Sequence, residues 1–397
     1  MKELLFASAC LVLFVLYLQG EKIYLAAKIN KIPLRICITG TRGKSTVTRL
    51  IAGILRENGQ KVLAKTTGSR PVMILPDGSE KEIQRQGRPS INEGKYILKT
   101  AVRLKTQALV VEMMGIQPET MSVEAAKIFK PHILVITNVR LDHQEQMGKA
   151  KEDIAASFAS AIPRKCSVFT PIKEFFPIYE EKARRVNASV WRVPDDFGTK
   201  DLENLGLETF YENDIQLAFS VAEELDVTRQ IAISGIKKAQ NDFGSLKVWT
   251  SKEGVLPESC CFVSAFAANE PESTAKILDY LKKKEVFKGK KRVALLSFRK
   301  DRGERTLQWI RAVEKGFLCD FDRVLLMGEH ARAALKKIAP VSKEQIFLTR
   351  TSDSPSEITR KAVYNDQYSV VVGMGNMMGL GHKLIQYWDS IGDSCDL

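Results

Sequence analysis

No pair of cysteines in this sequence has the C-x-x-C spacing that is typical of zinc sites and redox motifs. The seven cysteines, an odd number, stand at positions 10, 37, 166, 260, 261, 319 and 395. The sequence therefore indicates neither a complete disulfide framework nor a structural zinc site. Isolated thiols of this kind are usual in the reducing cytosol, and we expect them to be reduced.

Acidic residues are fewer than basic ones, and the difference gives a formal net charge of +13 at pH 7. Such a charge favours an acidic partner: nucleic acid, an anionic membrane surface, or an anionic small molecule or polymer. The densest basic run, Lys282 to Arg292, has Phe287 as its only aromatic residue, so it lacks the stacking side chains of a nucleic-acid site. We interpret this run as a solvated helix end and loop, and we expect no nucleic-acid partner.

The N-terminus lacks a full-length apolar span, which needs about 20 residues. Its run from Leu4 to Leu18 holds fifteen uncharged, mostly apolar residues. The only small-x-small triplet, Ala7-Ser8-Ala9, lies inside the run and too early for signal cleavage. The flank after the run is the more basic one. Residues 1–20 are therefore predicted to be a single uncleaved anchor in the cell membrane, with the catalytic domains in the cytoplasm; a buried core helix is the alternative.

From residue 34 onward, short apolar runs alternate with amphipathic stretches, which is the pattern of parallel βαβ units. In the first half we predict a helix at 44–58 and strands at 34–39, 61–66, 108–112 and 133–138. In the second half we predict strands at 261–267, 292–298, 323–328, 345–349 and 368–375, with helices between them. The chain is thus predicted to be an α/β protein with two parallel-sheet domains, 32–242 and 243–397, that join near Ala239 to Ser245.

The segment "ITGTRGKSTVTRL", Ile38 to Leu50, carries Gly, Lys and Ser in the order of a phosphate-binding loop. The standard pattern has its first glycine where Ile38 stands, and the nearest upstream glycine here is Gly40. The segment nevertheless lies between a predicted strand and a predicted helix, whose free N–H groups can hold phosphate. We predict that Lys44 reaches the nucleotide phosphates and that Ser45 ligates Mg²⁺; an ordinary capped helix start is the alternative. The predicted nucleotide-binding residues are Gly40, Thr41, Arg42, Gly43, Lys44, Ser45 and Thr46.

Two more polar clusters follow predicted strands of the first half. Glu112 ends one strand, and Asn138, Asp142 and His143 follow the next. Because ligands of parallel sheets bind at the carboxyl ends of the strands, these groups and the phosphate loop are expected to converge on one magnesium–nucleotide complex. Each residue alone has a simpler interpretation, Glu112 as a solvated surface group and His143 as a structural side chain.

The second half offers three candidates that lie between a predicted strand and a predicted helix: Asn269, Asp301 and Arg302. We predict that they contact the nucleotide across a cleft between the halves, with helix capping or ion pairing as the alternative. The segment "GMGNMMGLG" matches a dinucleotide fingerprint only loosely, because Met378 stands in place of the third glycine. A nicotinamide cofactor is therefore not expected.

Taken together, these residues resemble the Mur ligase family of ATP-dependent amide-bond synthetases, which includes folylpolyglutamate synthase. The family's loop G-T-x-G-K-[ST] is matched by "GTRGKS", and its N-x-x-x-D-H pattern by "NVRLDH". The resemblance covers about residues 34–390 and implies a P-loop ATPase domain followed by a Rossmann-like ligase domain, with ATP and Mg²⁺ at the site. It implies magnesium ligation by Ser45, Glu112 and His143. It implies catalytic roles for Lys44, His143 and Arg302, and nucleotide contacts by Asn269 and by the pair Asp301-Arg302.

Within this family, the sequence is most similar to the ligase subunit of the poly-γ-glutamate synthase complexes of bacterial capsules. The likeness is carried by "RGKSTVTRL", "KTTG", "FAAN" and "GMGN", and by the order of anchor, ATPase half and second half. It implies glutamate and an anionic poly-γ-glutamate chain as substrates, and small membrane-protein subunits of a capsule synthase as partners. Whether the chain also forms a homo-oligomer is open.

One position departs from the family pattern. Many Mur ligases carry a carbamoylated lysine about fifteen residues after the motif histidine, where this chain has Phe158. A familiar ligand of a second metal ion is therefore missing, which leaves open whether a second Mg²⁺ binds. The identity of the amino acid is open too. The alternatives to a poly-γ-glutamate ligase are a folylpolyglutamate-type or other amino acid ligase, a P-loop phosphotransferase, and a membrane-tethered nucleotide switch.

Overall fold

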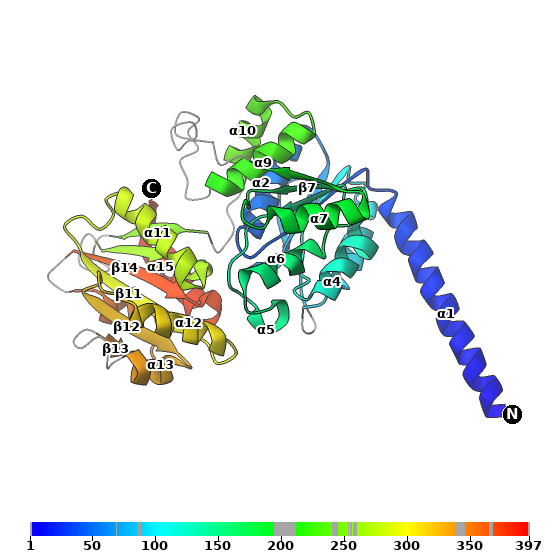
Figure 1. Cartoon of the computed structure of the whole chain (residues 1–397). Helices are drawn as coiled ribbons and strands as arrows, with labels where there is room; N and C mark the ends of the chain where they lie inside the picture. The colour runs from blue at the N-terminus through cyan, green and yellow to red at the C-terminus, as the bar shows by residue number, and fades with distance from the viewer. Residues whose placement is uncertain are drawn as a thin grey trace. The chain divides into compact units, whose positions relative to one another are not determined.

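The computed structural model describes most of the chain (Figure 1). The described residues are 2–68, 70–85, 87, 89–193, 212–239, 245–252, 254, 256, 260–338, 346–364 and 368–395. The chain divides into two compact units, Met1–Asn241 and Asp242–Leu397, and each is described by itself. The join predicted at Ala239 to Ser245 lies mostly outside the described residues.

The first unit is built on an eight-stranded sheet with the order β4-β3-β2-β5-β1-β6-β7-β8. From β2 to β8 in this order, neighbouring strands are parallel, whereas β3 is antiparallel to both of its neighbours, β2 and β4. The bounds are β1 Leu34–Thr39, β2 Val62–Thr66, β3 Val72–Ile74, β4 Glu80–Glu82, β5 Ala108–Glu112, β6 Ile133–Ile136, β7 Ser167–Thr170 and β8 Ser189–Arg192. The four predicted strands are confirmed, although β6 ends early because Thr137 and Asn138 bond to the loop after β1.

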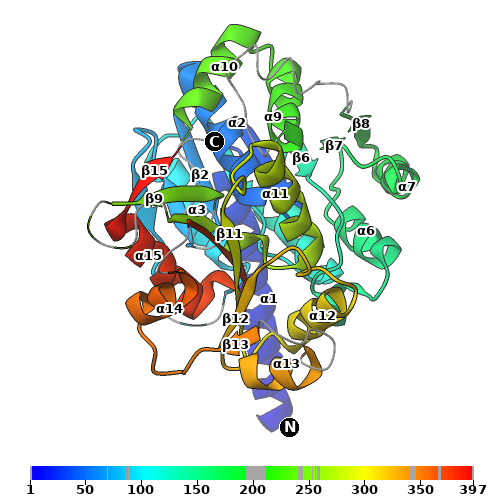
Figure 2. The same cartoon turned by 90° about the vertical axis from the view of Figure 1, so that its left-hand side faces the viewer.

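Helices cover both faces of this sheet, because successive side chains of the central strands point to opposite faces and both sets are apolar. Ile36 and Ile38 of β1 face α2, α9 and α10, while Cys37 faces α3, α4, α6, α7 and the π-helix η1. Figure 2 shows α2, α9 and α10 grouped on one side of the sheet. The bounds are α2 Lys44–Glu57, α3 Glu93–Arg103, α4 Pro118–Val123, η1 Glu124–Phe129, α5 Gln144–Met147, α6 Lys151–Ala159, α7 Phe176–Val186, α9 Glu212–Glu224 and α10 Arg229–Lys238.

The second unit holds a seven-stranded sheet with the order β13-β12-β11-β14-β10-β9-β15. Its first five strands in this order are parallel, and β9 is antiparallel to both of its neighbours, β10 and β15. The bounds are β9 Lys247–Ser251, β10 Cys261–Ser264, β11 Lys291–Phe298, β12 Arg323–Gly328, β13 Ile346–Leu348, β14 Ser369–Gly375 and β15 Gly392–Cys395. The predicted strand at 261–267 is wrong in its last part, which forms the short 3-10 helix η2, Phe266–Ala268. The turn brings Phe266 against Gly373, where any side chain would collide with the ring.

The core of the second unit is centred on Trp388 of α15. Its ring stacks on those of Phe262 and Phe266, with centroids 5.3 and 6.0 Å away, and its indole N–H donates to Thr359 Oγ1 at 3.1 Å. The helix bounds are α11 Pro271–Lys283, α12 Gly303–Glu314, α13 Ala331–Ile338, α14 Pro355–Ala362, η3 Met377–Gly381 and α15 His382–Ile391. This parallel sheet with connecting helices confirms the expected α/β class of the second half.

The N-terminal residues form a single long helix, α1, Lys2–Ile29. Within the described residues it is the one helix that is long and apolar enough to cross a bilayer. The large apolar side chains between Leu4 and Leu18 are exposed. The helix continues well beyond the anchor predicted at 1–20, so the span and the first strand are not joined by a flexible linker.

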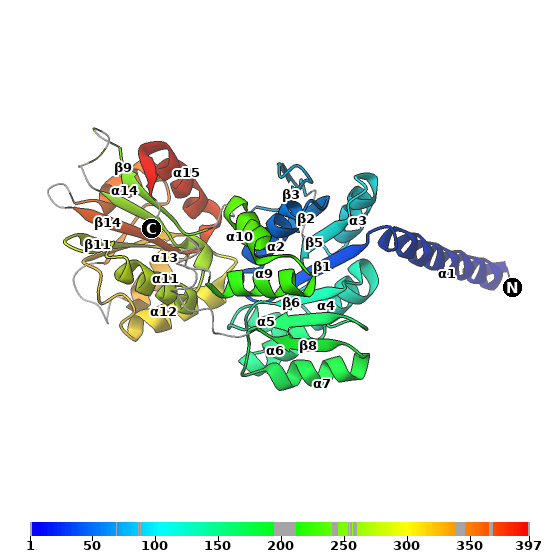
Figure 3. The ribbon, with the colours of Figure 1, turned by 90° about the horizontal axis from the view of Figure 1, so that it is seen from above.

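The last turns of α1 pack on the first unit. Leu25 and Ile29 are buried in the cluster that also holds the inner side chains of α3 and η1. Lys95 of α3 forms an ion pair with Glu21 at 2.5 Å, and Arg35 Nη1 donates to the carbonyl of Ile32 at 2.6 Å. Figure 3 shows that α1 leaves the first unit beside the start of β1. The helix is therefore part of this unit and not an appendage.

We expect two N-terminal deletions to differ sharply. Removing residues 2–20 should move the protein to the soluble fraction and leave the stability of the first unit unchanged. Removing residues 2–30 should lower its unfolding free energy by about 3–6 kcal/mol, because Leu25 and Ile29 each contribute roughly 1.5–3 kcal/mol when buried. Urea unfolding followed by a probe in the first unit measures this, and equal midpoints for the two deletions would contradict the packing of α1.

Candidate active site

The phosphate loop connects β1 to α2, and two glycines determine its path. Gly40 and Gly43 have φ angles of 126° and 80°, a region that side chains disfavour. A Cβ atom on Gly40 would lie 2.1 Å from Thr137 Oγ1, and one on Gly43 would lie 2.5 Å from Asp214 Oδ1. Both positions therefore need glycine for conformation and for space. The loop leaves the N–H groups at the start of α2 free to bind an anion.

The end of β6 holds the loop in place through its backbone. Asn138 Oδ1 accepts from the Arg42 N–H at 3.0 Å, and its Nδ2 donates to the Arg42 carbonyl at 2.9 Å. Thr137 Oγ1 donates to that same carbonyl at 2.5 Å. Thr41 exchanges hydrogen bonds with the backbone of Arg140, at 3.3 and 3.0 Å. Part of the predicted "NVRLDH" motif thus acts on the loop and not on a ligand.

Lys44 begins α2 and its side chain folds back over the loop. The ammonium donates to the carbonyls of Gly40 at 2.7 Å and of Thr41 at 3.2 Å. Desolvation lowers the pKa of Lys44, and the nearby carboxylate of Glu112 opposes that shift. Carbonyls are weak partners for a cation in such surroundings, so an anionic phosphate is a favourable replacement. The predicted role of Lys44 at the nucleotide phosphates stays a prediction.

Glu112 is 2% exposed and receives three hydrogen bonds at the end of β5. Ser45 Oγ donates to Oε2 at 2.7 Å, the Thr67 N–H donates to Oε2 at 2.7 Å, and Thr67 Oγ1 donates to Oε1 at 2.5 Å. The structure therefore brings together two of the three predicted magnesium ligands, Ser45 and Glu112. A hydroxyl and a carboxylate beside a phosphate loop are the hard oxygen donors that Mg²⁺ prefers, so these residues fit the metal.

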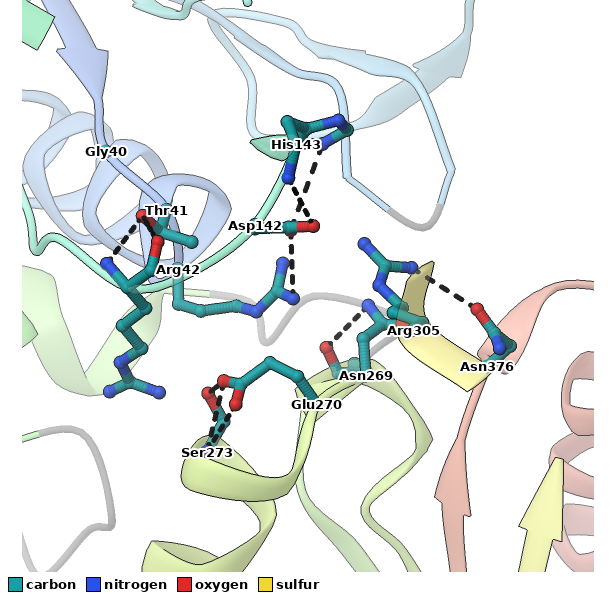
Figure 4. A network of polar contacts seen from close by, with 12 residues as sticks. Gly40, Thr41, Arg42, Asp142, His143, Asn269, Glu270, Ser273, Arg305 and Asn376 are labelled. Carbon is teal, nitrogen blue, oxygen red and sulfur yellow. Dashed lines mark hydrogen bonds and ion pairs between the residues drawn. The ribbon is translucent and has the colours of Figure 1, made fainter. Parts of the chain in front are cut away.

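The third predicted ligand, His143, contacts its neighbour Asp142. The His143 N–H donates to Asp142 Oδ1 at 3.0 Å, and His143 Nε2 lies 3.8 Å from Asp142 Oδ2. Asp142 also forms an ion pair with Arg42 of the phosphate loop at 3.1 Å (Figure 4). The described residues contain no group of three His, Cys, Asp or Glu side chains arranged to hold a metal. The assignment of His143 to the metal therefore stays a prediction.

Sequence reasoning missed a buried ion cluster below Glu112. Lys65 of β2 is 1% exposed and lies 3.3 Å from Glu93 Oε1 and 3.3 Å from the Glu112 carbonyl. Glu124 of η1 accepts hydrogen bonds from the N–H groups of Met114 and Gly115, just after β5. Desolvation lowers the pKa of Lys65 and raises that of Glu124. The motif "KTTG" contains Lys65 and Thr67, and its place at the end of a predicted parallel strand was the available signal.

Asp214 was also missed, and it lies directly against the phosphate loop. Its carboxylate is 8% exposed and occupies the space beside Gly43. Desolvation raises the pKa of Asp214 to about 8, against the attraction of Arg140. Asp214 belongs to α9, far from the loop in sequence, so no local motif marks it.

Asn269 takes a left-handed conformation, φ 62°, between η2 and α11. Its carbonyl accepts from the Trp309 indole N–H at 3.0 Å, and its side-chain amide donates to the Ala267 carbonyl at 3.0 Å. The next residue, Glu270, caps α11 by accepting from the Ser273 N–H at 3.0 Å (Figure 4). Capping thus falls to Glu270 and not to Asn269. The predicted nucleotide contact of Asn269 stays a prediction.

Asp301 and Arg302 are not paired with each other. The carboxylate of Asp301 makes a bidentate pair with Arg299, at 2.9 and 2.7 Å. Arg302 precedes α12, and within the described residues its buried Nε atom has no hydrogen-bond partner. Arg305, one turn further on, donates to Asn376 at 3.3 Å (Figure 4). Asp301 therefore does not neutralise the charge of the Arg302 guanidinium.

Phe158 is a core residue of α6. It is 3% exposed and belongs to the apolar cluster that also contains Ile154 and Ile162. The side chain at this position offers no atom to a metal, as the sequence indicated.

The raised pKa of Asp214 predicts a pH-dependent stability. In the folded state the Asp214 carboxyl stays protonated up to about pH 8, whereas in the unfolded chain it ionises near pH 4. Between these two pH values, the unfolding free energy should therefore fall by up to about 1.4 kcal/mol for each pH unit. The variant Asp214→Asn should lack this slope and exceed the natural protein in stability at pH 8. Urea midpoints between pH 5 and pH 9 measure the effect, and parallel profiles for the two proteins would contradict it.

Comparison with known families agrees with this geometry. The first unit matches the Mur ligase middle domain over residues 38–243, and the second matches the poly-gamma-glutamate synthase CapB C-terminal domain over residues 255–391. The resemblance inferred from "GTRGKS" and "NVRLDH" is thereby confirmed.

Two curated relatives are similar along nearly the whole chain. The capsule biosynthesis protein CapB of Bacillus anthracis is 30% identical over 386 residues, which cover 95% of this chain and 81% of that protein. The PGA synthase CapB of Bacillus subtilis (strain 168) is 29% identical over 385 residues, which cover 95% of each.

A solved structure shares the fold. The bifunctional folylpolyglutamate synthase/dihydrofolate synthase of Yersinia pestis, complexed with AMPPNP and Mn, has a TM-score of 0.69 at 14% identity over 93% of this chain and 92% of that chain. The family matches, the fold and the phosphate loop with its strand-end glutamate lead to one conclusion: this chain belongs to the Mur ligase family of ATP-dependent amide ligases, and to its branch with a CapB-type C-terminal domain.

Proposed function

We propose that this amide ligase polymerises glutamate through γ-amide bonds, as a poly-γ-glutamate synthase. The observation that carries the proposal is the union of two features in one chain. A phosphate loop faces a strand-end glutamate in the first unit, and the second unit matches the C-terminal domain of CapB. The 30% identity to CapB of Bacillus anthracis, over 95% of the chain, supports the same substrate class.

The reaction we propose has two steps. A carboxylate oxygen of the growing chain attacks the γ-phosphorus of ATP, and the bond to ADP breaks, which leaves an acyl phosphate. The amine of the next glutamate then attacks the acyl carbon, loses a proton, and phosphate leaves. Lys44 would exchange its bonds to the Gly40 and Thr41 carbonyls for phosphate oxygens. Its charge and the loop N–H groups would then stabilise the transferring phosphoryl group.

We propose that Ser45, Glu112 and His143 hold Mg²⁺. The bound ion would neutralise charge on the phosphate oxygens. Thr67 orients the Glu112 carboxylate through two hydrogen bonds, and Asp142 holds the backbone of His143. Because Phe158 cannot supply a ligand, a second ion at that place would need other donors.

From the second unit, we propose nucleotide contacts by Asn269, Asp301 and Arg302. Arg302 is the strongest of the three, because no described residue bonds its Nε and Asp301 is engaged with Arg299. A guanidinium can bind phosphate or carboxylate in a bidentate way that lysine cannot copy.

We further propose that α1 anchors the protein in the cell membrane with both units in the cytoplasm. The exposed apolar surface of α1 and the basic residues after it support this topology. Small membrane subunits of a capsule synthase would be the partners, and the net charge of +13 suits a polyanionic product. Homo-oligomer formation stays open.

Thr67 offers a test of the metal site. Thr67→Val keeps the shape of the side chain and removes the bond to Glu112 Oε1, so the Mg²⁺ concentration for half-maximal ATP turnover should rise by roughly tenfold, the scale found for residues that orient metal ligands. Thr67→Ser keeps the hydroxyl and serves as the matched control. An unchanged magnesium requirement in Thr67→Val would show that this bond does not position Glu112.

Ligation itself tests the proposed function. With ATP, Mg²⁺, glutamate and a polyglutamate primer, the full chain should release ADP and lengthen the primer. Lys44→Ala should lower this rate by at least about 10²-fold with an unchanged melting temperature, because Lys44 touches loop carbonyls and not the core.

The same assay separates the alternatives. Lengthening of a folate glutamate tail in place of the polyglutamate primer would indicate a folylpolyglutamate-type ligase. Transfer of labelled phosphate to a hydroxyl would indicate a phosphotransferase. ADP release that is independent of any amino acid would indicate a nucleotide switch.

A further inference from the structure

Five neighbouring strands of the first unit share a feature at their amino ends. In the sheet order β2-β5-β1-β6-β7, each strand is preceded within one to three residues by an exposed lysine. These are Lys61, Lys105, Lys31, Lys130 and Lys165. Parallel register brings the amino ends to one edge of the sheet, where neighbouring strands lie about 4.8 Å apart. We call this set the edge lysines.

The edge lysines have no acidic counterpart nearby in the chain. The connections that carry them, 30–33, 58–61, 104–107, 130–132 and 160–166, contain no aspartate or glutamate. Within the described residues, no ion pair involves the ammonium group of an edge lysine. Lys238, by contrast, pairs with Glu57 on the surface of this unit. The edge therefore carries a row of positive charge, with Glu224 at its β7 end, where that carboxylate accepts from Ser167 Oγ at 3.0 Å.

Three edge lysines stand where glycine would be easier to accommodate. Lys105, Lys130 and Lys165 have φ angles of 51°, 44° and 56°, in the left-handed region. Lys105 and Lys130 follow the ends of α3 and η1, positions at which glycine is the usual residue. Glycine would be less strained there, so the backbone conformation of these positions does not call for lysine.

The anchor helix enters the first unit at this same edge. α1 ends at Ile29, and Lys31 lies between it and the first residue of β1. The docked end of α1 touches α3 and pairs with its Lys95, and the exposed face of α3 carries Lys99 and Arg103 at helical spacing. The apolar run ends at Leu18, and α1 rises about 16 Å from there to Ile29. The headgroup layer and one screening length of about 8 Å together nearly span this distance, so the edge lies within reach of the membrane charge.

We propose that the edge lysines and the basic face of α3 bind the anionic headgroups of the membrane into which α1 inserts. This inference rests on the anchoring proposed above. The phosphate loop lies at the carboxyl end of β1, about 20 Å away for six residues, so the nucleotide site faces away from the lipid. ATP and glutamate then reach the site from the cytoplasm while the first unit is held flat on the bilayer.

An anionic polymer is the competing occupant of a basic edge. A chain under elongation must end at the phosphate loop, which lies at the opposite edge of the sheet, whereas the anchor is continuous with the edge lysines. The five charges lie in a row on separate loops. Such a row fits a flat membrane surface better than it fits a single strand of polymer. The structure therefore favours the membrane.

Amine labelling of the full chain tests the proposal. The chain is placed in nanodiscs of phosphatidylcholine, with or without phosphatidylglycerol, and labelled with a water-soluble amine reagent that is read out residue by residue by mass spectrometry. A surface potential of about −30 mV lowers the reactive fraction of a nearby amine by roughly threefold, so the edge lysines should label about threefold more slowly on the anionic discs. Exposed Lys149 and Lys173, in connections at the other edge, are the matched controls.

Each outcome decides the matter. Slower labelling of the edge lysines on anionic discs, with unchanged Lys149 and Lys173, supports the proposal. Equal labelling on both discs, with the chain bound to them, overturns it and leaves the anchor intact. Failure of the chain to co-elute with either disc overturns the anchor and the edge together. Protection by added poly-γ-glutamate in detergent, and none by lipid, would assign the edge to the polymer instead.

Discussion

The catalytic half of this protein depends on how closely its phosphate loop approaches the end of β6. Gly40 lies so near Thr137 that a single Cβ atom would not fit, and Asn138 holds the next backbone segment by both ends of its amide. The loop N–H groups therefore keep their direction before any phosphate arrives. Such preorganisation matters in phosphoryl transfer, because fixed dipoles stabilise developing charge without reorganising. It also explains why a shortened G-x-x-G-K-S spacing still makes a phosphate loop: the neighbouring strand supplies the missing support.

Burial of charge is the second constraint, and it surrounds the same site. Glu112, Lys65 and Glu124 are almost fully buried at the ends of β2 and β5, yet each has hydrogen-bond or ionic partners there. A buried ion cluster is a weak source of stability, since desolvation offsets most of the attraction. What it supplies here is position: Glu124 holds the backbone after β5, and Thr67 holds the carboxylate of Glu112. The cluster positions Glu112, which we propose as a metal ligand, more than it stabilises the fold.

The two edges of the first sheet carry different chemistry. Glycines, hydroxyls and acids gather at the carboxyl edge, where helix N-termini favour anions and metal-bound phosphate. A row of exposed lysines lies at the amino edge, where α1 enters. A parallel sheet separates these functions by its own geometry, because every strand points the same way. In the arrangement that we propose, the ligase would hold its substrate on one side and the membrane on the other.

Local patterns in the sequence determined much of this protein. The period of the apolar residues predicted β1, β2, β5 and β6 and the helix α2, because both faces of a covered parallel strand must be apolar. The spacing of "GTRGKS" and the strand-end place of Glu112 predicted the nucleotide site, since phosphate loops depend on contiguous residues. The tertiary structure decided the rest. Asp214 of the distant helix α9 lies against Gly43, and the Thr67 N–H after β2 donates to Glu112 of β5. Asp301 pairs with Arg299 and not with Arg302. Those contacts depend on which strands become neighbours and on how side chains fill the space between them, and no spacing along the chain encodes either.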